Sequence, residues 1–240
     1  MPVILNIETS NTACSVALCA EGMTLCHLED YHGQNHAALL SGFIKRCLDH
    51  LKDHELSLEA VAVSLGPGSY TGLRIGLSEA KGLAYALSIP LIGIDTLQLM
   101  ATSVIFSPDA PAADDIILVP MLDARRMEVY TAAYDTSLTC LLLPQPLILD
   151  NDSYASLLAT GRPVLFFGNG SDKYHRALSD GTITPHDGAN AAFMRDIQPL
   201  ATDMLALSEL KYSRREFLDL AYSTPTYLKD FQATKPKKLF

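Results

Sequence analysis

A glycine-rich segment is the first part of the sequence whose residue types suggest chemistry. Residues 64–82 read SLGPGSYTGLRIGLSEAKG, the pattern of a strand, a glycine loop and a helix, which binds phosphate in many proteins. A Walker A loop needs a lysine and a hydroxyl after its last glycine, but Leu73 and Arg74 follow Gly72. The dinucleotide fingerprint fails because Thr71 stands where its third glycine belongs. The sequence therefore leaves two interpretations open, an anion site built from backbone amides and a plain tight turn.

Two carboxylates occupy matching places in two predicted β-hairpins. Glu8 ends the strand that begins at Ile4, and Asp123 ends a strand over residues 116–122. A carboxylate at a strand end can hold a metal through water or act as a general base. It can equally accept hydrogen bonds from the amides of the following turn. The sequence does not decide between these roles.

Histidine and cysteine spacing argues against a metal site in this chain. His32 and His36 are four residues apart, but Gly33 follows His32 and no carboxylate lies between them, so we expect a loop histidine and a first-turn helix histidine. The five cysteines are scattered without a C-x-x-C pair, and they predict free thiols in a reducing cytoplasm. They are Cys14, Cys19, Cys26, Cys47 and Cys140.

The first third of the chain predicts a mixed sheet with helices packed on it. Short β-rich runs and stretches of helical periodicity alternate there in the order βββαβαβα. The expected strands are residues 4–8, 14–19, 23–29, 60–64 and 91–94, and the expected helices are residues 36–51 and 71–87.

The rest of the chain repeats this order. A segment rich in Pro, Ala and Asp, residues 106–115, marks a boundary between subdomains 1–105 and 106–240. Beyond it, a second hairpin covers residues 116–134, and residues 163–167 enter a second glycine loop. We expect a duplicated fold whose final helix, near residues 199–211, and C-terminal tail pack back on the first subdomain. A second helix is expected near residues 214–222, and the tail carries Lys229, Lys235, Lys237 and Lys238.

The helix after the first glycine loop carries small residues at four-residue steps. Gly72, Gly76, Ala80 and Ala84 fall on one helical face. Glycine inside a helix costs about 1 kcal/mol relative to alanine, so two glycines here need a reason, and close approach of another element supplies it. That element is either the chain's own sheet or a helix of a partner protein, and the pattern leaves both open.

Composition describes an ordinary folded protein with an acidic balance. The 240 residues are 48% hydrophobic and 19% charged, with a net charge of −9. The N-terminus lacks the features of a signal peptide and no apolar run is long enough to span a membrane, so we expect a cytoplasmic protein. The negative charge argues against a broad nucleic-acid surface.

Several segments together resemble the TsaB (YeaZ) family. They are VILNIETSNTACSVAL, NHAALL, SLGPGSYTGLRIGLSEAKGLAYAL, IPLIGIDTLQLMA, LDARRMEVYTAAY and TPTYLK. The resemblance covers residues 3–135 and recurs at residues 167–174 and near the C-terminus. This family is the non-catalytic subunit of the bacterial machinery that makes N6-threonylcarbamoyladenosine (t6A) in tRNAs reading ANN codons.

The resemblance implies an α/β fold of the ASKHA type, shared by actin, sugar kinases and Hsp70. It would consist of two βββαβα units, the second reduced. It also implies a catalytic sister, TsaD, whose metal is held by a His-x-x-x-His pair. Thr96 and Met100 stand at the matching positions, and neither replaces an imidazole on a metal. We therefore expect no catalytic residues, metal or cofactor in this chain, with ATP and metal on partner subunits. The older glycoprotease interpretation of the wider family needs the same missing pair.

The resemblance also assigns a partner surface to the helices at residues 36–51 and 71–87. The implied partners are a TsaD-like catalytic subunit, a TsaE-like ATPase and, for the chain alone, a second copy through the same helices; tRNA would be contacted only indirectly. The expected partner-binding residues are His36, Leu40, Phe43, Ile44, Cys47, Gly72, Leu73, Gly76, Leu77, Ala80, Lys81 and Ala84.

One alternative function uses the cleft that an ASKHA fold would form. A small-molecule kinase or ATPase would place its nucleotide there, and a scaffold would keep only a vestige of the site. The candidate residues for this vestigial nucleotide cleft are Glu8, Asp123, Gly168, Gly170 and Ser171.

Overall fold

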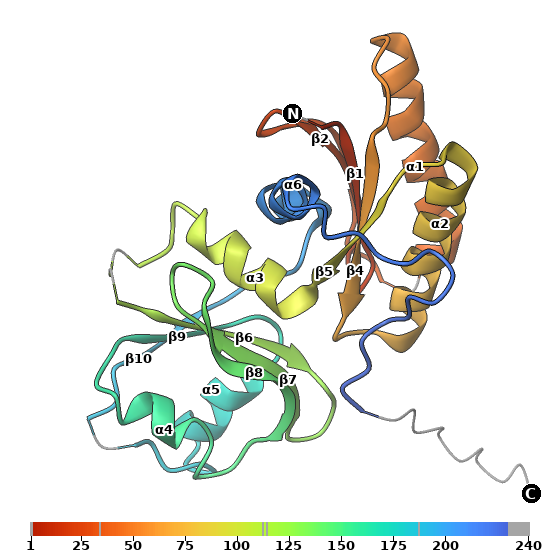
Figure 1. Cartoon of the computed structure of the whole chain (residues 1–240). Helices are drawn as coiled ribbons and strands as arrows, with labels where there is room; N and C mark the ends of the chain where they lie inside the picture. The colour runs from red at the N-terminus through yellow and green to blue at the C-terminus, as the bar shows by residue number, and fades with distance from the viewer. Residues whose placement is uncertain (1, 34, 112, 114, 187, 230–240) are drawn as a thin grey trace, which may run out of the picture.

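A computed structural model describes residues 2–33, 35–111, 113, 115–186 and 188–229. Two five-stranded sheets lie side by side, with helices on and between them (Figure 1). The three tail lysines Lys235, Lys237 and Lys238 lie outside the described residues.

The first sheet is mixed, as the order of its predicted elements required. Its strands run β3-β2-β1-β4-β5, with β1 antiparallel to β2 and parallel to β4. The strands are β1 (Ile4–Glu8), β2 (Cys14–Ala20), β3 (Met23–Asp30), β4 (Ala60–Gly66) and β5 (Leu91–Asp95).

The second sheet repeats the topology of the first. Its order is β10-β9-β6-β7-β8; from the β8 edge the strands of the second half follow as third, second, first, fourth and fifth, which is the order of neighbours in the first sheet. The strands are β6 (Ile117–Asp123), β7 (Glu128–Tyr134), β8 (Cys140–Ile148), β9 (Val164–Phe167) and β10 (Ala191–Met194). The predicted duplication is therefore confirmed strand by strand.

Helices cover the first sheet on both faces. α1 (His36–Asp53) and α2 (Tyr70–Leu87) pack on the face turned away from the second sheet (Figure 1). α3 (Thr96–Ile105), the short 3-10 helix η1 (Ala201–Met204) and α6 (Leu205–Ser213) cover the other face. The second half carries shorter helices, α4 (Ala155–Leu158) and α5 (Ser171–Ser179). The second unit is thus reduced in its helices while its sheet is complete.

α3 joins the two halves because two of its faces carry apolar side chains. Leu99 packs with Ile4 and Ile92 of the first sheet, whereas Leu97 and Met100 pack against the second sheet. A helix packed between two sheets needs apolar side chains on both packed faces, and Leu97, Leu99 and Met100 supply them.

The chain after α5 returns to the first sheet. Met204 and Leu207 belong to the apolar cluster on its inner face. The amide of Leu218 donates to Leu91 O at 2.8 Å, and the amide of Thr226 donates to Leu65 O at 2.7 Å. These contacts place the C-terminal segment against β4 and β5.

The helix expected near residues 214–222 is wrong. Arg215 has a left-handed backbone with φ of 57°, and the Asp219 carboxylate accepts hydrogen bonds from the amides of Ala221 and Tyr222. Such a side-chain-to-backbone pair competes with helical hydrogen bonds and stabilises turns instead.

Candidate functional site

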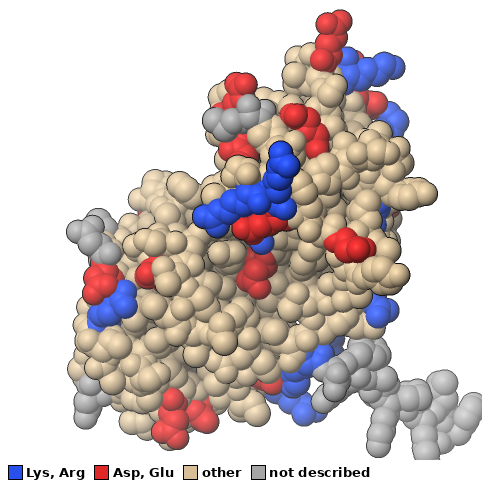
Figure 2. All heavy atoms as spheres, viewed as in Figure 1, with Lys and Arg blue, Asp and Glu red and all other residues tan. Residues whose placement is uncertain are grey.

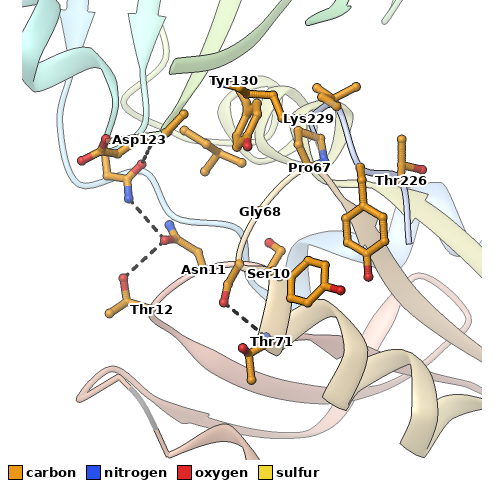
Figure 3. A pocket seen from close by; sticks show the side chains of 18 of the residues that line it. Ser10, Asn11, Thr12, Pro67, Gly68, Thr71, Asp123, Tyr130, Thr226 and Lys229 are labelled. Atoms are coloured by element: carbon orange, nitrogen blue, oxygen red, sulfur yellow. Dashed lines mark hydrogen bonds between the residues drawn. The ribbon is translucent and has the colours of Figure 1, made fainter. Parts of the chain in front are cut away.

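A cleft of about 830 Å³ opens where the two halves meet (Figure 3). Loops at the ends of β1, β4 and β6, the start of α2 and the C-terminal segment form its walls. Its lining residues are Ser10, Asn11, Thr12, His36, Ala37, Pro67, Gly68, Ser69, Tyr70, Thr71, Gly72, Ile75, Leu122, Asp123, Ala124, Arg125, Tyr130, Asn169, Thr226, Tyr227, Leu228 and Lys229.

The glycine loop between β4 and α2 is packed tightly on the loop that follows β1. A Cβ atom at Gly68 would lie 2.3 Å from Ser10 O, and the Ser69 amide donates to that same carbonyl at 2.6 Å. Ser69 also caps α2, because its Oγ accepts from the Gly72 amide at 3.2 Å. Close approach of two loops thus accounts for Gly68, and the turn interpretation explains this loop without a phosphate.

Glu8 lies below the cleft and not in it. The side chain is fully buried, and its Oε1 accepts from the Ser10 amide at 2.5 Å. Burial raises the pKa of Glu8 to about 7, although hydrogen bonds from Ser10 and Ser64 act in the opposite direction. The carboxyl group therefore organises the β1 turn, and it is not among the residues that line the cleft.

Asp123 does line the cleft, and a lysine neutralises it. Lys173 Nζ lies 2.5 Å from Asp123 Oδ1, 2.7 Å from Arg126 O and 2.9 Å from Glu128 O. These three acceptors use all three protons of the ammonium group. Lys173 thus places a fixed cation against the carboxylate that a metal-dependent site would use.

The second glycine loop is also closed by packing. A Cβ atom at Gly168 would lie 2.5 Å from Met121 O, and the Gly170 amide donates to that carbonyl at 2.9 Å. Asn169 alone among residues 168–171 lines the cleft; its side chain accepts a hydrogen bond from the Asp123 amide and donates one to Asn11 Oδ1.

The five residues predicted for a vestigial nucleotide cleft are divided in the structure. Asp123 lines the cleft, whereas Glu8 is the last residue of β1, Gly168 and Gly170 lie in the loop after β9, and Ser171 begins α5. The four that do not reach it are Glu8, Gly168, Gly170 and Ser171.

An aromatic wall closes the cleft on the side of the C-terminal segment. The rings of Tyr70 and Tyr227 lie 5.0 Å apart between centroids, and the Arg74 guanidinium lies 4.1 Å above the Tyr70 ring. Arg74 Nε donates to the Tyr227 hydroxyl at 3.0 Å. Lys229 then forms an ion pair with Glu128 of the second half at 2.7 Å, so this segment crosses from one half to the other.

Thr96 and Met100 are buried in the protein interior. Both side chains are fully inaccessible, and Met100 packs in the cluster between α3 and the second sheet. His36 Nε2 lies 2.8 Å from Asn11 O; because a carbonyl oxygen only accepts, that nitrogen carries the proton. His32 pairs instead with Asp30 at 2.8 Å.

The expected partner-binding residues on α1 and α2 differ in how exposed they are in the structure. All but Phe43 and Lys81 are buried within the chain, because they face the chain's own sheet. A Cβ atom at Gly72 would lie 2.0 Å from Thr9 O, which explains the small residues by contact with the β1 turn. The buried ones are His36, Leu40, Ile44, Cys47, Gly72, Leu73, Gly76, Leu77, Ala80 and Ala84.

The opposite face of the same two helices has features that the sequence analysis missed. Gly42 in α1 and Gly82 in α2 are exposed, and a Cβ atom at either would meet nothing within 4 Å. Ser41 of α1 donates to Glu79 of α2 at 2.7 Å, so both glycines lie within one helical turn of the seam between the helices. In the sequence, this surface could have been found from Gly42, a glycine inside the helix predicted at residues 36–51.

Charged side chains and free thiols are scattered over the chain. Figure 2 shows acidic and basic side chains interspersed on the viewed face between wide uncharged areas. Within the described ranges, every helix is too short or too polar to cross a bilayer. All five cysteines are free thiols.

Most of the chain is similar in sequence to proteins of tRNA threonylcarbamoyladenosine synthesis. The family model for TsaD, tRNA N6-adenosine threonylcarbamoyltransferase, matches residues 30–237. The tRNA threonylcarbamoyladenosine biosynthesis protein TsaB of Bacillus subtilis (strain 168) is 30% identical over 224 residues, 86% of this chain and 95% of that protein. The TsaB protein of Escherichia coli (strain K12) is 35% identical over 131 residues, 55% of this chain and 54% of that protein.

Solved structures agree with these sequence similarities. An uncharacterized Pseudomonas aeruginosa protein, described as similar to peptidase YeaZ, superposes with a TM-score of 0.78 at 25% identity, over 95% of this chain and all of that one. YeaZ from the same organism gives a TM-score of 0.72 at 25% identity with the same coverage. Both halves of the chain are therefore included in the similarity.

Proposed function

This chain belongs to the TsaB family of tRNA threonylcarbamoyladenosine biosynthesis proteins, and we propose that it is a non-catalytic subunit that binds and activates a TsaD-like transferase. That transferase would move threonylcarbamoyl onto adenosine 37 of tRNAs reading ANN codons. A TsaE-like ATPase would join the pair, and ATP and metal would reside on those partners.

The cleft supports a non-catalytic role. Among the described lining residues Asp123 is the one carboxylate, and Lys173 already neutralises it; the positions matching a metal-binding histidine pair hold the buried Thr96 and Met100. A kinase or ATPase would need a carboxylate free to hold a hydrated magnesium ion beside the phosphates. This arrangement therefore disfavours the alternative function.

The exposed glycines carry the proposal for the partner surface. Gly42 and Gly82 each cost their helix about 1 kcal/mol, and among the described residues no atom lies within 4 Å of a Cβ built at either. Small residues at a helix surface allow another helix to come close, since side chains at the contact set the distance between axes. Ala38, Ser41 and Ser78 extend the small exposed surface around them. We assign this outer face of α1 and α2 to the equivalent helices of the TsaD-like subunit.

The same face would serve self-association when the catalytic subunit is absent. In an isologous dimer, both copies use the same surface patch. A partner with the same fold can therefore take the place of the second copy and bind this chain through that patch. Homodimer and heterodimer would then exclude each other.

Glutamine substitutions test this assignment. Gly42→Gln and Gly82→Gln add a long side chain to an exposed helix position and leave the interior unchanged. Ser179→Gln, on the exposed side of α5, is the matched control. We expect the two glycine variants, and not the control, to lose co-purification with the TsaD-like subunit while melting at or above the wild-type temperature. Undiminished co-purification of both glycine variants would refute the assignment.

A further inference from the structure

Two neighbouring arginines lie beside the cleft: Arg125 lines it, and Arg126 is the next residue in the chain. Arg125 and Arg126 occupy the turn between β6 and β7, and both side chains are exposed. Their backbones are left-handed, with φ of 69° and 49°. That conformation costs a residue other than glycine on the order of 1 kcal/mol, and turns of this kind favour asparagine or glycine. Within the described chain, no carboxylate forms an ion pair with either guanidinium.

The neighbouring charges make this part of the cleft locally positive. Among the described residues that line the cleft, Asp123 alone is acidic, and it is paired with Lys173; the nearby Glu128 is paired with Lys229. The two guanidiniums are thus left uncompensated on a chain whose net charge is −9. An anion approaching the molecule would be attracted here rather than to its acidic surroundings.

Aromatic rings lie next to these charges. Tyr130 is half-buried and points into the cleft from the second half (Figure 3). Tyr70 and Tyr227 line the same cleft from the first half and the C-terminal segment. Guanidiniums bind phosphate, and tyrosine rings stack on unpaired bases, which is how proteins recognise single-stranded RNA.

We propose that this cleft mouth, built from Arg125, Arg126 and Tyr130, binds a single-stranded segment of tRNA. The proposal rests on the chain's proposed role in tRNA modification, and it replaces the expectation that tRNA is contacted only indirectly. A cleft of about 830 Å³ falls in the ordinary range of small-ligand pockets, about 300–1,000 Å³, so it takes splayed-out nucleotides and not a duplex.

The test measures tRNA affinity as a function of salt for the complex with the TsaD-like subunit. Arg125→Asn and Arg126→Asn, made together, remove both charges, while asparagine tolerates the left-handed backbone. Arg215→Asn is the matched control, because Arg215 is also an exposed arginine with a left-handed backbone, at the end of α6 and outside the cleft lining. Tyr130→Leu removes the ring and keeps an apolar side chain of moderate size.

The double arginine variant should bind tRNA more weakly, and its slope of log K against log salt should fall by about 1.4, since each phosphate contact to a single strand contributes about 0.7. Tyr130→Leu should weaken binding about 5- to 150-fold, the range for one stacked base. The control should match wild type. The arginine variants should melt at or above the wild-type temperature, and all variants should stay folded and co-purify with the TsaD-like subunit.

An unchanged salt slope in the double variant would overturn the proposal. Loss of co-purification in that variant, with tRNA affinity of the chain alone unchanged, would assign the arginines to a protein contact and would equally overturn it. If the wild-type chain does not bind the TsaD-like subunit at all, the proposed function fails; the salt slopes measured on the chain alone still decide the tRNA site.

Discussion

Replacing glycine by alanine in α2 should have opposite effects on stability at two positions. Gly76 and Gly82 both lie inside the helix, but Gly76 faces the β1 turn and Gly82 faces outward. A Cβ atom at Gly76 would lie 2.2 Å from Thr9 Oγ1, whereas one at Gly82 would meet nothing within 4 Å. Thr9 cannot easily yield, because it is fully buried and its Oγ1 donates to Gly72 O at 2.8 Å.

The expected free energies follow from these distances. Replacing glycine by alanine gains about 1 kcal/mol in a helix interior, so Gly82→Ala should raise the free energy of unfolding by about that amount. Overpacking a core site costs up to about 3 kcal/mol. Because alanine again gains about 1 kcal/mol, Gly76→Ala should lower the free energy of unfolding by about 2 kcal/mol. The two variants should differ by about 3 kcal/mol, or by about 6–12 °C in melting temperature for a protein of this size.

Urea unfolding and calorimetry of both variants would measure this difference. Thr9→Ala removes the colliding oxygen and leaves the Thr9 Cβ position, which is 3.4 Å from the new methyl group. In that background Gly76→Ala should no longer destabilise, giving a coupling energy of about 3 kcal/mol. Equal stability of Gly76→Ala and Gly82→Ala, or a coupling energy near zero, would refute the assignment of the small stripe to the chain's own sheet.

Three further predictions concern the cleft and the groups beneath it. Lys173→Met should lower the free energy of unfolding by about 1–2 kcal/mol in urea titrations, because Arg126 O and Glu128 O lose their donor. The loss is limited because the half-exposed Asp123 can be hydrated by water instead. Burial raises the pKa of Glu8 from 4.5 to about 7, so the folded chain keeps a proton that the unfolded chain releases, and stability should fall as the pH rises from about 4.5 to 7. Glu8→Gln should abolish this component, about 3 kcal/mol at most, in unfolding curves at several pH values; an identical pH profile would contradict it. Tyr227→Ala should speed hydrogen exchange of the Thr226 amide about 2- to 12-fold by loosening the aromatic wall, and unchanged exchange would show that the wall does not hold this segment.

Strand order was predictable because each half contains the same local signals. Alternating and β-branched residues identify β1, β2, β4 and β6, and short turns fix their pairing. β8 was missed, since Pro144 and Pro146 within CLLLPQPLI indicate a segment that cannot form a full ladder, and the structure places it at the edge of the sheet, where prolines are tolerated. β10 has only four residues and no strong pattern of its own.

The functional residues were harder to predict, because a small-residue stripe does not say which neighbour it meets. The sequence pattern around Gly72 and Gly76 is the same whether the chain's own sheet or a partner helix packs against them. The position of Thr9 in the structure shows that the neighbour is the chain's own β1 turn. The pairing of Lys173 with Asp123 joins residues 50 apart, which no local pattern reveals. Positive φ values at Arg125 and Arg126 likewise depend on the turn geometry and not on residue type.

The most direct measurement is t6A formation on unmodified tRNA with purified components. The TsaD-like subunit, a TsaE-like ATPase and the threonylcarbamoyl adenylate donor would be combined with wild-type chain, with Gly82→Gln, or with no addition. We predict t6A only when wild-type chain and the TsaD-like subunit are both present, and a strong loss with Gly82→Gln. Formation of t6A by this chain without the TsaD-like subunit, or full activity of that subunit without this chain, would contradict the account.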